Sequence, residues 1–581
     1  MDSLRKIQDP KELFILKQKA AKYYQENAVP SKMEEILNTM FFDDPDDVFG
    51  HLTNYFEKFA KPAVISKIRA REVFDSRGQP AIETDLFCTI KNNEKLVNRN
   101  IVGNECYLMD NVPATEKDSD DSARYSSIVA ALQLLMGDVQ DKVKGLSPLN
   151  QDEIDGIALN VIEELRIKDQ EEKAAENAEV AQESQSAVPP AASPSAGKKS
   201  AKGKKGPPVV IIPDEPREKL FPGCTAVCAI SQAVCNAAAI VSDIPLYQHI
   251  YNLKFKETLA ESIKLPLPMV TIMQSGKAAP GKQNCVKEFM VIPKPDMPVK
   301  ESIKNISNIY QTVLKTLYTK LGVTIKNVSE SGAICPQFDR PEQGLDAIQE
   351  AITTLGFTPG EDFHIAINAA GHEMFDSEKG KYEVVTGMQK LPDDMPDFWA
   401  ELLGRYQSII ALIDPIRKED KVQWMAICER LSERCYIISD NKCPRPGLLK
   451  DNEPVDDFKT SAVVMKMEQI TSVSDIINAS KTMEYKENQV IISSSVGDSS
   501  DSFITDLAVG IQSRFLKTGS PCRGERVAKL NRLLQIGEQL EEQNKLVKWD
   551  EHIFPKLSLP PPPETPEGEA DANAEQDAKK K

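Results

Sequence analysis

The hydrophobic and polar positions along the chain divide it into a helical region, a long mixed region and two stretches of low apolar content. In residues 1–62 the apolar side chains follow helical spacing, as Met33, Ile36, Leu37 and Met40 do. From residue 64 to residue 555, short apolar runs typical of strands alternate with amphipathic runs typical of helices. The pattern predicts a small helical module followed by an α/β body.

Two stretches have too little apolar content to offset the entropy of ordering the chain. Residues 168–216 are rich in Ala, Ser, Pro, Lys and Glu, and residues 556–581 contain a run of prolines followed by many acidic residues. We predict that both are disordered, the first as an insertion in the body and the second as a tail. The lysines of the insertion are interpreted as a solvated linker rather than a binding patch.

The helical module has clear breaks but little material for a core. Val29-Pro30 interrupts the first helical run, and Asp44 is predicted to cap a third helix that includes Val48, Leu52 and Tyr55. A region this short is not stable alone. We therefore expect it to pair with a second copy or to pack on the body.

Polar residues follow several of the predicted strands. In a barrel of alternating strands and helices, the side chains at the carboxyl ends of the strands surround the active site. We therefore expect these residues to meet at one mouth. The strands and the residues that follow them are 363–367 with Asn368, 408–413 with Asp414, 436–439 with Asp440, 462–465 with Lys466, and 490–493 with Ser494.

Composition removes several classes of function. The formal net charge of −17 argues against a general nucleic-acid partner, which needs a basic surface. No apolar run is long enough to span a bilayer, so no membrane partner is expected. The eleven cysteines lack zinc-type spacing and are interpreted as reduced packing residues of a cytoplasmic protein.

The body resembles a known family. The segments 67–80, 245–250, 288–290 and 517–523 are similar, in this order, to segments of enolases, and long colinear matches are specific. The resemblance implies an enolase-type barrel at 260–555 preceded by an α+β amino-terminal capping domain at 64–250. The whole chain resembles sperm-type members of this family, which implies a place in the glycolysis of the sperm flagellum.

The helical module resembles a different family. Segments 24–30, 45–48 and 55–58 are similar to the docking and dimerisation domain of protein kinase A regulatory subunits and Dpy-30 proteins. Such a domain is a dimeric bundle whose apolar groove takes an amphipathic helix of an anchoring protein. The alternative is a helical extension that only covers the body.

The resemblance to enolases implies roles for particular residues. Enolases dehydrate 2-phosphoglycerate to phosphoenolpyruvate, which requires a base, an acid, Mg²⁺ and cations for the phosphate. Lys466 matches the proton acceptor of the family. Glu288, Lys517 and Gln469 match substrate-binding residues, and Asp440 matches one of three metal-binding carboxylates.

Other functional positions of the family are altered. Asn368 and Ile413 replace the other two metal carboxylates, and Ser331 stands at the position of the acid. Ser494 and Ser495 stand where the family has a histidine and the phosphate-binding arginine. Magnesium is the cofactor implied by the resemblance, but the set of oxygen ligands for it is reduced.

Two functional hypotheses follow. The first is a weak enolase, in which Glu330 or Asp414 could substitute for a missing group. The second is a non-catalytic homologue that acts as a structural or anchoring subunit of a sperm flagellar glycolytic assembly. In that case Lys466, Lys517 and Glu288 form an ionic network without turnover. Both imply a homodimer or a heterodimer with another enolase.

Overall fold

The computed structural model describes residues 10–104, 117–185, 213, 220–256, 261–278, 286–443, 459–549 and 551–554. The chain forms two compact units. One comprises Met1–Ala63 with Thr89–Glu94, and the other comprises Val64–Cys88 with Lys95–Lys581. The predicted tail 556–581 and most of the predicted insertion lie outside the described residues.

The helices of the amino-terminal unit occur where the apolar spacing predicts them. They are α1 Pro10–Glu26, α2 Val29–Asp43 and α3 Val48–Glu57. The predicted cap of α3 at Asp44 is wrong. Asp44 ends α2 in the left-handed conformation, which aspartate tolerates better than most residues. Asp47 caps α3 instead, since its side chain accepts the N–H of Gly50 at 2.9 Å.

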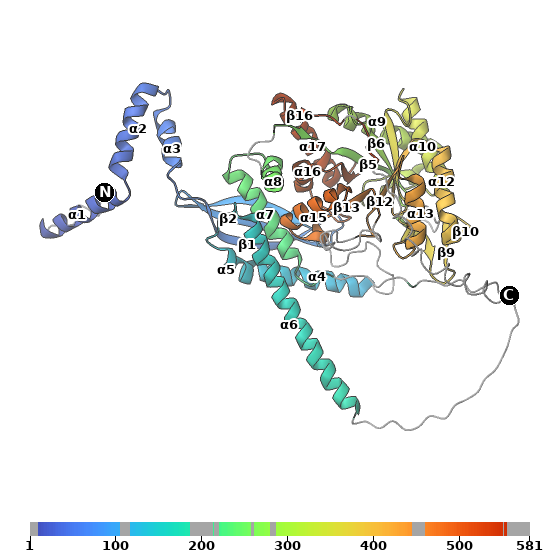
Figure 1. Ribbon diagram of the computed structural model, residues 1–581, viewed down its shortest axis with the longest axis horizontal. Coiled ribbons are helices and arrows are strands. Elements are labelled where there is room, and N and C mark those ends of the chain that lie inside the picture. Colours follow the sequence, from blue (N-terminus) through green and yellow to red (C-terminus); the bar gives the residue numbers. More distant parts are fainter. Residues whose placement is uncertain are drawn as a thin grey trace, which may run out of the picture. The chain divides into compact units, whose positions relative to one another are not determined.

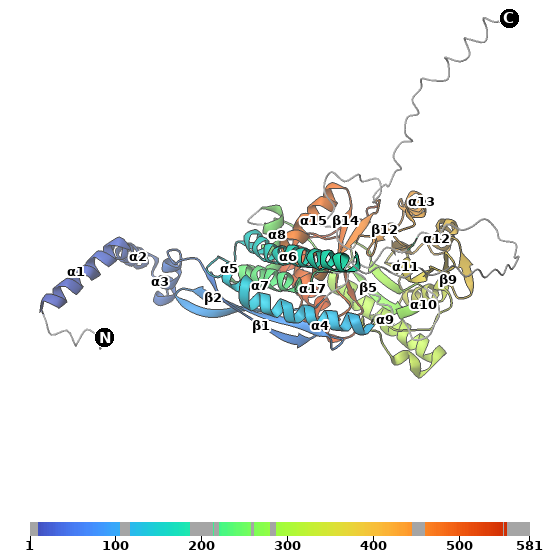
Figure 2. The ribbon, with the colours of Figure 1, turned by 90° about the horizontal axis from the view of Figure 1, so that it is seen from below.

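The capping domain consists of a three-stranded sheet covered by helices. Strands β1 Val64–Phe74, β2 Pro80–Ile90 and β3 Asn93–Val102 lie in that order, as the two hairpin connections predict. Helices α4, α6 and α7 form a layer over one face of the sheet (Figure 2). Nearly every side chain of α7 is buried. The helices are α4 Lys117–Leu134, the π-turn Leu135–Val139, α5 Gln140–Val143, α6 Gln151–Gln185, α7 Thr225–Val241 and α8 Leu246–Phe255.

Helix α6 corrects the predicted extent of the disordered insertion. The helix continues through Gln185, so 168–185 is helical, and this part extends beyond α4 and α7 (Figure 1). Its sequence is rich in Ala, Glu and Lys, which are strong helix formers, and ion pairs such as Lys173–Asp169 at 2.7 Å support it. The buried first half, with Ile154 and Ala158, anchors the helix. Apart from Pro213, the rest of the insertion lies outside the described residues.

The second domain is a closed barrel of eight strands, which confirms the predicted fold. Every neighbouring pair is parallel except that β6 runs antiparallel to both β5 and β7. The five strands expected from polar residues at their ends are all present. In their order around the barrel the strands are β11 Ile409–Ile413, β12 Tyr436–Ser439, β13 Ala462–Met465, β14 Gln489–Ser493, β15 Phe515–Gly519, β5 Leu267–Gln274, β6 Glu288–Pro293 and β7 Phe363–Asn368.

Two apolar layers hold the barrel together. The inner layer fills the barrel with side chains such as Met269, Met290, Val464 and Phe515. The outer layer lies between the strands and the surrounding helices. The larger helices are α9 Val299–Leu321, α10 Pro341–Thr354, α12 Met395–Arg405, α13 Lys421–Leu431, α15 Val473–Tyr485, α16 Phe503–Gly510 and α17 Gly524–Glu542.

Short elements complete the barrel domain. β8 Phe375–Asp376, β9 Lys381–Val385 and β10 Met388–Lys390 form a small antiparallel sheet, and β4 Ile263–Lys264 pairs with β16 Leu546–Val547. The remaining helical turns are α11 Gly371–Met374, α14 Met467–Ile470, and the 3₁₀ turns Gly276–Ala278, Val323–Lys326 and Pro392–Asp394. Within the described part of the chain, no single helix meets the length and apolarity of a membrane crossing. Among the described helices, the bent pair α7–α8 meets these criteria when the two are taken together, on length and composition alone.

Candidate functional site

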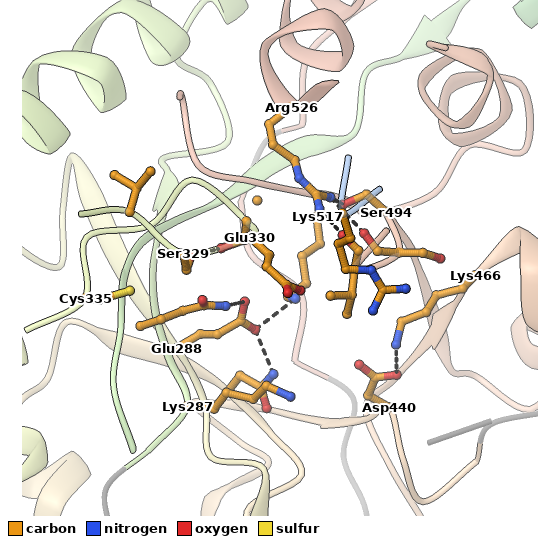
Figure 3. A pocket seen from close by; sticks show the side chains of 18 of the residues that line it. Lys287, Glu288, Ser329, Glu330, Cys335, Asp440, Lys466, Ser494, Lys517 and Arg526 are labelled. Carbon is orange, nitrogen blue, oxygen red and sulfur yellow. Dashed lines mark hydrogen bonds and ion pairs between the residues drawn. The ribbon is translucent and has the colours of Figure 1, made fainter. Parts of the chain in front are cut away.

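A pocket of about 640 Å³ lies at the carboxyl ends of the parallel barrel strands (Figure 3). Glu288 reaches the same mouth although it begins its strand, because β6 runs antiparallel and pairs Glu288 with Asn368 and with Gln274. The described lining residues from the barrel strands and their ends are Gln274, Lys287, Glu288, Asn368, Asp440, Lys466, Ser494, Ser495, Val496, Lys517 and Gly519.

Glu288 is held as a carboxylate at the bottom of the pocket. Its Oε2 lies 2.9 Å from Lys517 Nζ and accepts a hydrogen bond of 2.7 Å from Asn368 Nδ2, while Oε1 accepts one of 3.2 Å from Gln274 Nε2. Burial raises the pKa of Glu288, but the Lys517 ammonium and the Asn368 amide outweigh burial and lower that pKa to about 2. The sequence-predicted pair Glu288 and Lys517 is therefore in direct contact.

A second ion pair lies on another side of the pocket. Lys466 follows β13 as the first residue of the turn into α14, and its Nζ lies 3.1 Å from Oδ1 of Asp440, which follows β12 (Figure 3). Both side chains are largely buried. The residue expected to be the base is therefore bound to the residue expected to hold a metal.

A third group of contacts surrounds Arg526, near the start of α17. Its guanidinium donates to Ser494 Oγ at 2.8 Å, to the Ser495 carbonyl at 2.9 Å and to the Val496 carbonyl at 2.7 Å. It also forms an ion pair of 3.3 Å with Asp498. Its Nε is buried and has no hydrogen-bond partner. Arg526 thus occupies the part of the mouth that contains Ser494 and Ser495.

The capping domain contributes one cation to the pocket. Arg77 lies in the turn between β1 and β2. Its buried Nε lies 3.6 Å from Asp75 Oδ2 in an ion pair and has no hydrogen bond among the described residues. The close approach needs a glycine on the barrel side. A Cβ on Gly497 would lie 1.9 Å from Asp75 Oδ2 and 2.9 Å from Arg77 Nε. The hydrogen bond from Ser76 N to Asp498 O, at 2.9 Å, holds the two loops together.

Known proteins resemble this chain along most of its length. Residues 262–551 match the model of the enolase carboxyl-terminal TIM barrel domain. Enolase 4 of Xenopus laevis is 36% identical over 97% of this chain and 98% of its own length, and Enolase 4 of Homo sapiens is 35% identical over 94% and 91%. Enolase of Thermococcus kodakarensis is 31% identical over 55% of this chain and 72% of its own length. The chain belongs to the enolase family.

The structure shows why the altered positions of this enolase-family chain do not provide a metal site. Ile413 is completely buried in the inner layer of the barrel. Asn368 uses Nδ2 for Glu288 and accepts the N–H of Ala370 with Oδ1 at 3.1 Å. Asp414 is not among the described lining residues, and its side chain accepts the N–H groups of Asp440 and Asn441, at 3.1 and 2.7 Å.

The carboxylates that remain do not fit a hard divalent cation. Asp440, which the sequence predicts to be the one remaining metal ligand, forms an ion pair with Lys466. Among the residues that the structure describes, no three His, Cys, Asp or Glu side chains come together in an arrangement that could hold a metal ion. A magnesium site normally combines carboxylates with substrate oxygens. The ligand set present here does not fit the Mg²⁺ of the family.

Asp414 is a buried carboxyl with an unusual environment. Burial and the neighbouring Asp440 carboxylate raise the pKa of Asp414 to about 7, against the two backbone N–H groups that lower it. It has a φ of 44°, in the left-handed region. These contacts make it a support for the loop that carries Asp440. They do not leave it available to replace a missing metal ligand.

The position of the acid has no strong proton donor. Ser331 Oγ lies 2.9 Å from Ser329 Oγ, and a hydroxyl is a poor acid at neutral pH. Glu330 lines the pocket and is exposed (Figure 3). Of the two residues predicted to be able to substitute for a missing group, only Glu330 faces the cavity.

One residue predicted to bind substrate is not among the described lining residues, and three residues of the lining had no predicted role. Gln469 is buried in α14 and is not among the described residues that line the pocket. Arg77, Lys287 and Arg526 do line it and had no predicted role. The signal for Lys287 was its place directly before Glu288, and it pairs with Glu373 at 2.9 Å. The contacts of Arg77 and Arg526 had no local signal, since they depend on distant loops.

Proposed function

We propose that this enolase-family chain is a lyase that converts 2-phosphoglycerate to phosphoenolpyruvate slowly. The observation that carries the proposal is the meeting of Lys466, Lys517 and Glu288 in one pocket at the barrel mouth. These residues match the base and two substrate-binding positions of the family. They lie on elements far apart in the sequence, so only a preserved barrel geometry brings them together.

The residues supply part of the required chemistry. Lys466 would take the proton next to the substrate carboxylate, and the Lys517 ammonium would stabilise the charge that develops on the carboxylate oxygens. Two features make the reaction slow. Lys466 Nζ lies 3.1 Å from Asp440 Oδ1, and this ion pair must open before the lysine can reach the substrate. Ser331 at the acid position removes general acid catalysis, which typically contributes about 10²–10⁴-fold.

The test is phosphoenolpyruvate formation by the purified chain, prepared from a host whose own enolase has been separated. We expect weak turnover that Lys466→Ala abolishes. Lys320→Ala removes a lysine that is exposed on α9 and pairs with Glu350, so it is a matched control and should leave turnover unchanged. Equal rates in the wild type and Lys466→Ala would contradict the lyase proposal.

The amino-terminal unit supports a second candidate function, an anchoring subunit of a sperm flagellar glycolytic assembly. Ile36 is the only fully buried apolar residue among the described side chains of α1–α3. Large apolar side chains are exposed instead, with Phe41, Phe42 and Phe49 each at least 80% exposed. Apolar exposure of this extent marks an interaction surface.

We infer that this surface pairs with a second copy of the chain, because three short helices with one buried side chain cannot form a stable core alone. A hollow lined by Leu37, Met40, Phe41, Pro45 and Val48 supports docking of an amphipathic helix from an anchoring protein on the paired unit. Deletion of residues 1–62 should abolish binding of such a helix and any dimer that depends on this unit, measured by analytical ultracentrifugation. Dimerisation that survives deletion would assign pairing to the body.

The anchoring role also predicts where the chain is located in the cell and which proteins it binds. The chain should localise to the sperm flagellum by immunofluorescence, and affinity purification from sperm should recover it with other glycolytic enzymes. A second enolase chain in that fraction would support a heterodimer, and its absence would favour a homodimer. Uniform distribution through the cell, without flagellar enrichment, would contradict the anchoring role.

A further inference from the structure

The carboxylates around the pocket already have cations of their own. Asp440 pairs with Lys466 at 3.1 Å, and Glu288 pairs with Lys517 at 2.9 Å. In a metal-dependent site, carboxylates at such positions would compensate the charge of the ion. In this chain lysine ammonium groups do so instead.

Basic side chains outnumber acidic side chains in the described lining of the pocket. The described lining contains five basic side chains, Arg77, Lys287, Lys466, Lys517 and Arg526, and three acidic ones, Glu288, Glu330 and Asp440. The partners of the other three cations, namely Asp75, Glu373 and Asp498, do not line the cavity. The described lining therefore has more basic than acidic side chains, because three of the five carboxylates that pair with its cations lie outside it.

Two of the arginines have an Nε atom without a hydrogen bond among the described residues. The Nε of Arg526 and the Nε of Arg77 are both buried, and the latter lies 3.6 Å from Asp75 Oδ2, beyond hydrogen-bond distance. Arg526 itself is only 2% exposed. Arginine and lysine suit carboxylate and phosphate oxygens, so an anion in the pocket would be attracted by the basic side chains of the lining. A divalent cation would instead meet an excess of positive side chains.

We propose that this pocket binds a phosphorylated carboxylic acid without a divalent cation, with its own lysine and arginine side chains supplying all of the positive charge. The choice of 2-phosphoglycerate as the ligand rests on the proposed function. Metal independence rests on the ion pairs and on the buried position of Ile413. It holds whether or not the bound acid reacts.

The first experiment measures the affinity of the full chain for 2-phosphoglycerate by isothermal titration calorimetry, with EDTA and then with excess Mg²⁺. We expect the two dissociation constants to agree within about twofold. An affinity at least about tenfold higher with Mg²⁺ would overturn the proposal, as would no binding in either buffer. Metal-independent binding without turnover would leave this inference standing and contradict only the lyase proposal.

The second experiment changes the charge of the lining. Arg77→Gln lies in a turn, where the side chain is 22% exposed, and should weaken binding by about tenfold in both buffers. Lys300→Gln removes an exposed lysine of α9 that pairs with Glu538, and is the matched control with unchanged affinity. Equal affinity in the wild type and Arg77→Gln, with both proteins folded by circular dichroism, would remove Arg77 from the binding site.

The third experiment introduces a carboxylate at position 368, where the enolase family is expected to have a metal ligand. Asn368→Asp adds a negative charge beside Glu288, so binding in EDTA should weaken and Mg²⁺ should partly restore it. The same variant should gain a thermal shift with Mg²⁺ that the wild type lacks. A wild-type chain that already shows a Mg²⁺-dependent thermal shift in the absence of ligand would contradict the proposal.

Discussion

The Nζ of Lys466 lies 3.1 Å from Oδ1 of Asp440 at the mouth of the barrel. In terms of the family, this contact joins the position of the base to the position of a metal ligand. A carboxylate that already pairs with a lysine is less available to coordinate Mg²⁺. A lysine that pairs with a carboxylate is less available to accept a proton from the substrate. The same ion pair therefore explains both the slow reaction and the metal independence that we propose.

Removal of the Asp440 carboxylate should make Lys466 a more effective base. In Asp440→Asn, Lys466 no longer has to break this ion pair to reach the substrate, so we expect kcat to rise by about tenfold. The measurement is steady-state formation of phosphoenolpyruvate by the wild type and the variant at saturating 2-phosphoglycerate. Loss of all activity in this variant would mean that Asp440 is required, as a metal ligand would be.

The buried pair at the bottom of the pocket should be sensitive to the removal of one partner. Lys517→Met leaves the Glu288 carboxylate buried without its cation, and we expect a loss of about 3–5 kcal/mol in the free energy of unfolding. Adding Glu288→Gln to this variant should recover part of the loss, because the uncompensated charge disappears. Urea denaturation of the two single variants and the double variant gives the coupling energy. Additive losses would show that the pair is not coupled.

The lowered pKa of Glu288 predicts how stability depends on pH. Its pKa falls from 4.5 to about 2 on folding, so its contribution to stability is present above pH 4.5 and is lost as pH falls toward 2. Glu288→Gln should remove this part of the acid dependence. Urea midpoints of the wild type and the variant, measured at several pH values in this window, should therefore converge as the pH falls. Parallel curves would contradict the assignment.

The loop contact between the two domains predicts a glycine requirement. Gly497→Ala would place a Cβ 1.9 Å from Asp75 Oδ2, so the loops must separate, and we expect a loss of about 1–3 kcal/mol together with weaker ligand binding. Gly404→Ala in α12 is the matched control, since its Cβ would meet no atom within 4 Å. In that variant, alanine should stabilise the helix by up to about 1 kcal/mol. Similar effects of the two substitutions on ligand binding would contradict the inference that Gly497 positions Arg77.

Some features of the site followed from local pattern. The apolar runs that end in Asn368, Asp414, Asp440, Lys466 and Ser494 are barrel strands, and four of these five residues line the pocket. The exception is Asp414, which has a left-handed backbone and whose side chain accepts the backbone N–H of Asp440. Strand pattern predicts which residue ends a strand, but the conformation of the following loop decides where its side chain points.

Other features were wrong or absent for physical reasons. Helix α6 continues to Gln185, through a stretch predicted to be disordered, because helix propensity and ion pairs along the helix compensate for low apolar content. Glu288 lies at the mouth of the barrel because β6 runs antiparallel to its neighbours. The direction of a strand cannot be read from the apolar residues within it. The place of Arg77 depends on contact between a turn of the capping domain and a loop that follows β14.

By itself, the sequence determined the helices of the amino-terminal unit, five strands of the barrel and several of the side chains at its mouth. These depend on the periodicity of apolar residues and on residues near in the chain. Only the tertiary structure decided that Lys466 binds Asp440, that Arg526 approaches Ser494 and that Ile413 fills the barrel. Such pairings join residues of different elements. They are set by strand direction, loop conformation and packing, which the local pattern does not encode.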